Sequence, residues 1–221
     1  MPNFISKIYL SSTGVFIRKI INSSGIMSRF VAKVIGVNKL RNKDVSVWKD
    51  GTTHKTDVYK NLDENANVLL DFVQKNTKKD DGILDICCNQ GRFLFHLQTK
   101  GYTKLYGFDI MSTAISTIKN RVDFNPQLMH VEHSLAQDFF KDKEENQFDW
   151  AITYSATIEL INPEFDIFKE LSRTIKKGMI LVINENGHAY PRFYRLLHKI
   201  NGFKIIETKT LDDKTLIFSK K

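Results

Sequence analysis

Cysteines and long apolar runs are what this chain of 221 residues most clearly lacks. Its two cysteines, Cys87 and Cys88, are adjacent and cannot join distant parts of the chain by disulfides. No apolar run approaches the roughly 20 residues of a membrane-spanning helix, and the basic N-terminus lacks the apolar core of a secretory signal. We therefore expect a cytoplasmic protein that is stabilised by one buried core.

Acidic residues are absent from the first 43 positions, which contain eight lysines and arginines. The net charge of +8 therefore comes from this segment, because basic and acidic residues are equal in number in the rest of the chain. We predict a basic, amphipathic helical extension with a linker at residues 1–60, and a catalytic domain at 61–221. The balanced charge of that domain gives no reason to expect nucleic acid as its partner.

The N-terminal extension allows three interpretations, which we favour in the following order. It forms a cap that packs an apolar stripe, Ile26 to Ile35, on the domain and helps to close the acceptor site. Alternatively, residues 1–35 lie on an anionic membrane surface. The third interpretation, nucleic-acid binding through the same charges, comes last because no known nucleic-acid module is present.

Strand patterns alternate with helical patterns from Gly82 onward. The pattern predicts strands at 83–87, 105–108, 128–132, 149–154, 179–184, 203–208 and 215–219. It predicts helices at 65–75, 92–99, 112–120, 164–174 and 191–200, with turns at 177–178 and 211–214. This order indicates an α/β fold, with a doubly wound, mostly parallel sheet of seven strands and an antiparallel C-terminal strand.

The segment from Ile83 to Leu94 holds the most informative loop, in which a strand ending in Asp85 enters a helix just after Gly91. A dinucleotide site would need the pattern G-x-G-x-x-G, which is absent. A carboxylate suits an amino group better than a pyrophosphate. Asp109, at the end of the next strand, can accept hydrogen bonds from a ribose diol, each worth about 1.5–3 kcal/mol. Together these residues indicate an adenosine-like ligand with a cationic amino-acid tail.

The same loop resembles the first motif of class I S-adenosylmethionine-dependent methyltransferases, strand-Asp-x-Gly-x-Gly-x-Gly-helix, with Cys87 and Asn89 at the first two glycine positions. The resemblance extends from about Asn65 to Lys221 and implies S-adenosylmethionine as the cofactor. It assigns cofactor binding to Asp85, Cys87, Asn89, Gly91, Asp109, Ile110, Ser134 and Leu135. Asparagine tolerates left-handed backbone, so Asn89 is a mild departure from the motif.

Candidate catalytic residues follow the fourth and fifth strands. Tyr154 and Glu159 would lie beside the transferred methyl group, although Tyr154 could equally be a packed aromatic residue. His188 is our candidate for a general base, because the ordinary pKa of histidine is near neutrality. The loop after the fourth strand lacks the Asn/Asp-Pro-Pro-aromatic pattern, which argues against adenine-N6 and glutamine as acceptors.

We expect no metal site, because the two adjacent cysteines have no second pair and His130 and His133 point to opposite faces of a strand. The favoured function is methyl transfer to an oxygen or nitrogen of a small metabolite, such as a sugar or a biosynthetic intermediate. One alternative is a lipid or quinone methyltransferase at the membrane surface. Another is a non-catalytic protein that retains the fold and binds the cofactor.

Overall fold

A seven-stranded sheet forms the centre of the computed structural model, which describes residues 61–156, 165–184, 198–212 and 214–221. The strands are β1 (Gly82–Ile86), β2 (Lys104–Asp109), β3 (Met129–His133), β4 (Phe148–Tyr154), β5 (Ile175–Asn184), β6 (Lys204–Leu211) and β7 (Lys214–Lys220). The helices are α5 (Glu64–Asn76), α6 (Arg92–Thr99), α7 (Ser112–Lys119), α8 (Ala136–Lys141) and α10 (Ile167–Thr174).

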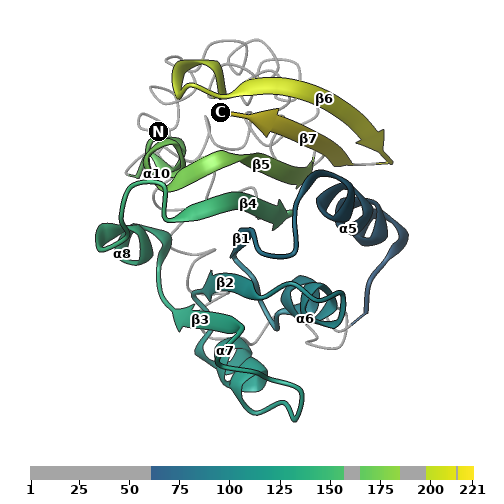
Figure 1. Ribbon diagram of the computed structural model, residues 1–221, viewed down its shortest axis with the longest axis vertical. Helices are drawn as coiled ribbons and strands as arrows, with labels where there is room; N and C mark the ends of the chain where they lie inside the picture. Colours follow the sequence, from purple (N-terminus) through teal and green to yellow (C-terminus); the bar gives the residue numbers. More distant parts are fainter. Residues whose placement is uncertain (1–60, 157–164, 185–197, 213) are drawn as a thin grey trace, which may run out of the picture.

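The strand order β3-β2-β1-β4-β5-β7-β6 is that of a doubly wound sheet (Figure 1). Strands β1 to β5 pair in parallel, whereas β7 is antiparallel to both of its neighbours, β5 and β6. The chain winds outward from β1 to β3, then returns to β4 on the other side of β1. Ligands of such sheets bind at the carboxyl ends of the strands where this reversal occurs, here between β1 and β4.

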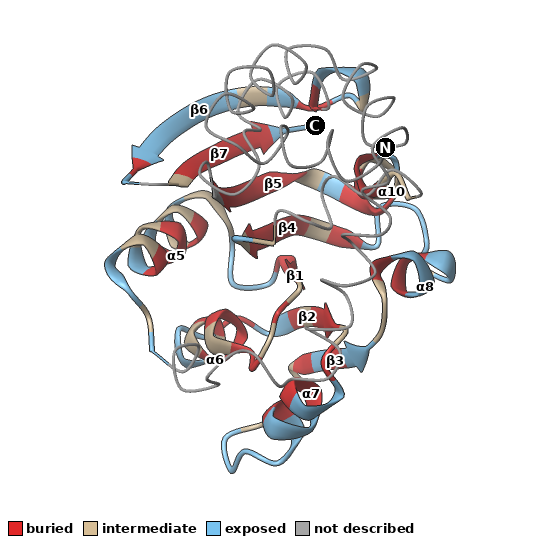
Figure 2. Ribbon diagram, turned by 180° about the vertical axis from the view of Figure 1, so that it is seen from behind, coloured by how far each residue is buried: buried red, intermediate tan, exposed pale blue. Residues whose placement is uncertain are grey.

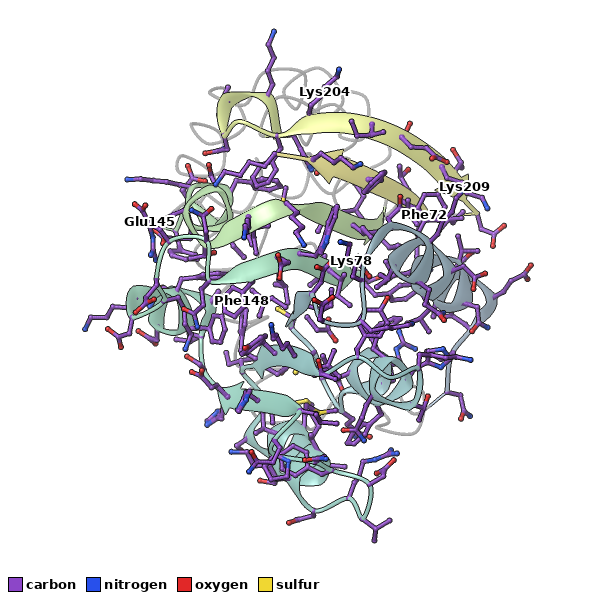
Figure 3. The ribbon with its side chains drawn as sticks, viewed as in Figure 1. Phe72, Lys78, Glu145, Phe148, Lys204 and Lys209 are labelled. Carbon is purple, nitrogen blue, oxygen red and sulfur yellow. The ribbon has the colours of Figure 1, made fainter. Side chains whose placement is uncertain are left out.

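Two apolar layers, one on each face of the sheet, form the core. Leu69 of α5, Leu94 of α6 and Ile118 of α7 pack with Ile83 on one face. On the other face, α8 and α10 contribute a second cluster that includes Leu84. Figure 2 shows the inner strands as buried and the outer strand β6 as largely exposed. The side chains of Lys204 and Lys209 project from β6 (Figure 3).

Most predicted elements are confirmed to within one or two residues, including the antiparallel C-terminal pair. Helix α5 illustrates why: the Asp63 carboxylate accepts a hydrogen bond from the Ala66 amide at 2.7 Å and so caps a helix with an apolar stripe. Helix α10 begins at Ile167, and the predicted start at Glu164 lies outside the described residues. The same is true of most of the helix predicted at 191–200, of which 198–200 is helical.

The predicted turn at Lys177–Gly178 is wrong, because both residues belong to β5, which begins at Ile175. Gly178 pairs with Trp150 of β4 and with Lys220 of β7. A Cβ atom at Gly178 would lie 2.2 Å from the Ser219 carbonyl oxygen and 2.8 Å from the Trp150 ring. The glycine therefore allows close strand packing here, and its presence was misread as a chain reversal.

Two further differences concern short segments. Helix α8 was not predicted, because its six residues are too few to show a helical period, yet it buries Phe139 and Phe140. The turn between the last two strands is shorter than predicted, since β6 extends to Leu211 and β7 begins at Lys214. Among the described helices, none combines the length and apolar character needed to cross a bilayer.

Candidate cofactor and active site

The loop between β1 and α6 turns through three residues with left-handed backbone. Cys87 has φ 58°, Asn89 φ 48° and Gly91 φ 73°. These are the three positions at which the resembled motif has glycine, so the chain retains a glycine-like path with only one glycine. The path is tight: the Gly91 amide donates to the Cys88 carbonyl at 2.9 Å.

Asp85 lies within β1 at the base of this loop, and its side chain is almost completely buried, with 1% of the residue exposed. Its Oδ2 atom has no hydrogen-bond partner among the described residues. Burial raises the pKa of Asp85 well above its ordinary value, the Arg92 guanidinium opposes that shift, and the carboxylate of Asp109 adds to it. A buried acceptor without a donor is what a ligand ammonium or its ordered water would satisfy.

Asp109 ends β2 and holds the loop from the neighbouring strand. Its Oδ2 accepts from the Asn89 amide at 2.8 Å and its Oδ1 from the Met111 amide at 2.9 Å. Burial raises the pKa of Asp109, although these two hydrogen bonds counteract the rise. Each carboxylate oxygen can accept more than one hydrogen bond, so the side chain can support the loop and still accept from a ribose diol.

The candidate adenine-binding residues are tied together beside the end of β2. The Ser134 amide donates to the Asp109 carbonyl at 3.0 Å, and the Ser134 hydroxyl donates to the Leu135 carbonyl at 3.0 Å. A ring nitrogen of His133 lies 3.0 Å from the Ile110 carbonyl. The structure therefore brings Ile110, Ser134 and Leu135 to the same edge as Asp109. The contact of the exposed His133 ring with the Ile110 carbonyl was not predicted.

The two cysteines point into different layers of the domain. Cys88 is buried in the cluster that contains Ile83, whereas Cys87 is half-buried beside the cluster that contains Leu84. A Cβ atom at Gly107 would lie 2.9 Å from the Cys88 sulfur. Burial raises the pKa of the Cys88 thiol well above its ordinary value, and the nearby Asp85 carboxylate adds to the shift, so the thiol stays protonated. Its position is that of a packing residue.

Tyr154 ends β4 at the carboxyl edge and joins that strand to α5. Its hydroxyl donates to the Asp63 carboxylate, with distances of 2.8 and 3.0 Å to the two oxygens. Its ring lies 5.6 Å from that of Phe93. The next residue, Ser155, has φ 64° and donates its amide to the Val182 carbonyl of β5 at 2.7 Å.

The other two catalytic candidates, Glu159 and His188, lie outside the described residues. Two residues that the sequence analysis missed help to shape this edge. Asp63 holds Tyr154, and its place before an apolar helix was a recognisable capping signal. Thr153 donates its hydroxyl to the Ile86 carbonyl at 3.0 Å, and so joins the ends of β4 and β1. That bond depends on strand pairing and has no local signature.

A sequence model of the methyltransferase domain matches residues 83–178, which include β1 to β4 and the loop described above. This match and the site geometry agree. The chain has the fold of the class I S-adenosylmethionine-dependent methyltransferases, and its segment 83–178 matches the methyltransferase domain. S-adenosylmethionine is bound in one solved structure with this fold.

Solved structures with the same fold include three at low sequence identity. An S-adenosylmethionine-dependent methyltransferase from Listeria monocytogenes has a TM-score of 0.59 at 14% identity, over 71% of this chain and 99% of its own. Magnesium protoporphyrin IX methyltransferase from Synechocystis PCC 6803, with bound S-adenosylmethionine, has a TM-score of 0.58 at 14% identity, over 71% of this chain and 77% of its own. A methyltransferase from Aquifex aeolicus has a TM-score of 0.56 at 15% identity, over 76% of this chain and 98% of its own.

One curated relative, from Methanocaldococcus jannaschii, is named as a candidate ribosomal RNA large subunit methyltransferase. Its sequence is 30% identical to the sequence of this chain over 93 residues, which are 38% of this chain. The match spans 23% of the length of that relative. The shared segment therefore concerns a part of the archaeal protein.

Proposed function

We propose that this methyltransferase transfers the methyl group of S-adenosylmethionine to an oxygen or nitrogen of a small metabolite, such as a sugar or a biosynthetic intermediate. The proposal rests above all on one observation: the buried Asp85, one residue before the end of β1, and the buried Asp109, at the end of the adjacent parallel strand β2, lie beside a loop with glycine-like backbone. The Oδ2 atom of Asp85, which has no partner in the part of the chain that the structure describes, is suited to an ammonium, and the Asp109 carboxylate to a ribose.

The residues of this chain would bind and orient the reactants. Asp85, Asp109 and the loop amides would hold the two ends of the cofactor, with Ile110, Ser134 and Leu135 beside its base. When bound, the cofactor supplies an electrophilic methyl carbon, so that the protein contributes mainly alignment of the acceptor. Tyr154, at the carboxyl end of β4, would border the acceptor, and Glu159 and His188 remain our candidates for further polar groups, His188 as the general base.

The acceptor class is tested with S-adenosylmethionine that carries a labelled methyl group. The full chain is incubated with a cell extract separated into small metabolites, lipids, and RNA with ribosomes. We expect label in the small-metabolite fraction with the wild type and none with Asp109→Ala. Label that enters only RNA would contradict the proposal and favour the second candidate, an RNA acceptor, for which the archaeal relative is the supporting observation.

Label that enters only lipid would instead favour the membrane-surface alternative. Cofactor binding without transfer to any fraction would favour a non-catalytic role. The balanced charge outside residues 1–43 is the reason for placing the small metabolite first.

A further inference from the structure

Strand β6 forms one outer edge of the sheet, and among the described residues it pairs only with β7. Of its eight residues only Ile205 and Leu211 are not exposed (Figure 2). The amide and carbonyl groups on the outer side of an edge strand can form a ladder with another extended chain. The edge therefore offers a backbone surface to which a further strand can be added.

An open hollow of about 720 Å³ runs along the first half of this strand, lined by Lys199 and residues 202–208. Successive strand residues all line it, although their side chains alternate between the two faces, so the hollow lies along the edge of the strand. Ile206, which lines the hollow, is 49% exposed, and Ile200, in the helical segment before β6, is 61% exposed. Apolar side chains beside an open hollow indicate an interaction surface.

The three charged residues of β6 share one face of the sheet. Lys204, Glu207 and Lys209 are opposite alternate residues of β7, and alternate residues point to the same face. The register shift between Ile205 and Glu207 supplies the extra residue that brings Lys204 to the side of Glu207. Lysines alone on an edge discourage strand addition, but here an acid lies between two of them.

A second copy of this chain complements that pattern when two β6 strands pair antiparallel about a twofold axis at Thr208. Glu207 of each copy then lies opposite Lys209 of the other, on the same face, and the two Thr208 residues lie opposite each other. In the same register Lys204 comes near Asp212, an exposed acid in the turn after β6. A twofold axis at Glu207 or at Lys209 would instead place like charges opposite each other, which is unfavourable.

We propose that β6 is the interface of a dimer in which two copies of this chain join their sheets edge to edge. The register places the second half of one β6 strand along the hollow beside the first half of the other. Backbone hydrogen bonds supply the attraction, and the two pairs of Glu207 with Lys209 fix the register. This interface lies outside the candidate cofactor site, and the inference does not depend on the proposed function.

Sedimentation velocity of the full chain over a range of concentrations measures the association, and we expect the wild type to dimerise reversibly. Glu207→Lys and Lys209→Glu each convert both opposite-charge pairs into like-charge pairs. Each should raise the dissociation constant of the dimer by about 10-fold or more. Both side chains are exposed, so the variants should keep their fold, which circular dichroism checks.

A mixture of the two single variants tests the register directly. Glu207→Lys has two lysines at the paired positions and Lys209→Glu has two glutamates, so the unlike copies should form a heterodimer. The double variant Glu207→Lys/Lys209→Glu restores both pairs with reversed charges and should dimerise about as well as the wild type. The matched controls, Lys100→Glu and Glu145→Lys, make the same changes in charge at exposed positions elsewhere and should leave the dimer unchanged.

A wild type that stays monomeric at all concentrations would overturn the proposal and leave the edge of β6 to a different protein. A dimer that both edge variants leave unchanged would overturn it as well, since the association would then use another surface. Failure of the mixed variants to form a heterodimer, or an equal loss of dimer in the controls, would show that the pairing of Glu207 with Lys209 is wrong.

Discussion

Single residues decide how the loop after β1 departs from the glycine-rich motif that it resembles. Cys87 and Asn89 adopt the left-handed backbone that glycine favours, and non-glycine residues pay for it with strain of about 1–3 kcal/mol each. The surrounding contacts maintain the conformation. The Asp109 carboxylate accepts a hydrogen bond from the Asn89 amide, and the Cys88 side chain fills the space beside Gly107. The departures therefore change the side chains of the loop but keep its path.

Asp85→Asn should stabilise the cofactor-free protein at neutral pH. Because burial raises the pKa of Asp85, the folded state holds this proton more tightly than the unfolded state, and stability falls as pH rises above about 4. The asparagine variant lacks this effect, so we expect it to be more stable by about 1–3 kcal/mol at pH 7.5. Urea unfolding at pH 7.5 and pH 4 checks this. A difference that is absent, or the same at both pH values, would be inconsistent with a raised pKa.

At the scale of elements, the sheet and helices of the domain could be largely predicted, since periodic apolar residues and capping signals are local. The errors arose where tertiary contacts decide. Gly178 belongs to β5 because β4 and β7 approach it closely, and α8 is too short for a periodic pattern. In the site, Asp85 and Asp109 were recognisable from the strand ends, but Thr153 and the Tyr154–Asp63 contact depend on segments far apart in sequence.

Gly178→Ala should destabilise the sheet severely. The added methyl group would meet the Ser219 carbonyl oxygen and the Trp150 ring, neither of which can move without separating strands. We expect a loss of about 3 kcal/mol or more in the free energy of unfolding. Gly82→Ala is the control, since its Cβ atom would lie at least 3.5 Å from its neighbours. Equal stability of the two variants in chemical denaturation would contradict the packing.

The opposite, amino-terminal edge of the sheet is joined by a polar network around Asp81. Its carboxylate accepts from the Trp150 indole at 2.9 Å and from Lys177 of β5, and Lys177 also lies 3.0 Å from Asp149. Burial alone would raise the pKa of Asp81, but its hydrogen bonds with Lys177, the Lys78 amide and Trp150 hold the pKa below its ordinary value. The ionised carboxylate therefore stabilises this edge.

Asp81→Asn should destabilise the protein by about 2 kcal/mol at pH 7, where the wild-type carboxylate is fully ionised. A lowered pKa contributes stability above the unfolded value of about 4, and that stability is lost as pH falls through the folded pKa. The difference from wild type should therefore shrink in strong acid. Asp80→Asn, at the exposed neighbouring position, should have little effect. Thermal unfolding at pH 7 and below pH 3 measures both variants.

In the molecule as a whole, the stabilising polar contacts and the candidate cofactor site lie at opposite edges of the sheet. The amino edge around Asp81 is closed by ion pairs and hydrogen bonds. The carboxyl edge holds a strained loop, the end of β4 and a buried acid, Asp85, whose Oδ2 atom has no donor among the described residues. A protein tolerates such costs where a ligand offsets them, which agrees with a cofactor site at the point where the strand order reverses.

The central claim is that Asp85, Asp109 and the loop between them bind S-adenosylmethionine. Calorimetric titration of S-adenosylmethionine and S-adenosylhomocysteine into the wild type and into Asp109→Ala tests it most directly, with thermal unfolding to show that both proteins are folded. We predict micromolar binding by the wild type and a loss of about 100-fold or more in the variant, since two charge-assisted hydrogen bonds to the ribose disappear. A folded wild type that binds neither ligand, or a variant that binds both as well as the wild type, would contradict the account.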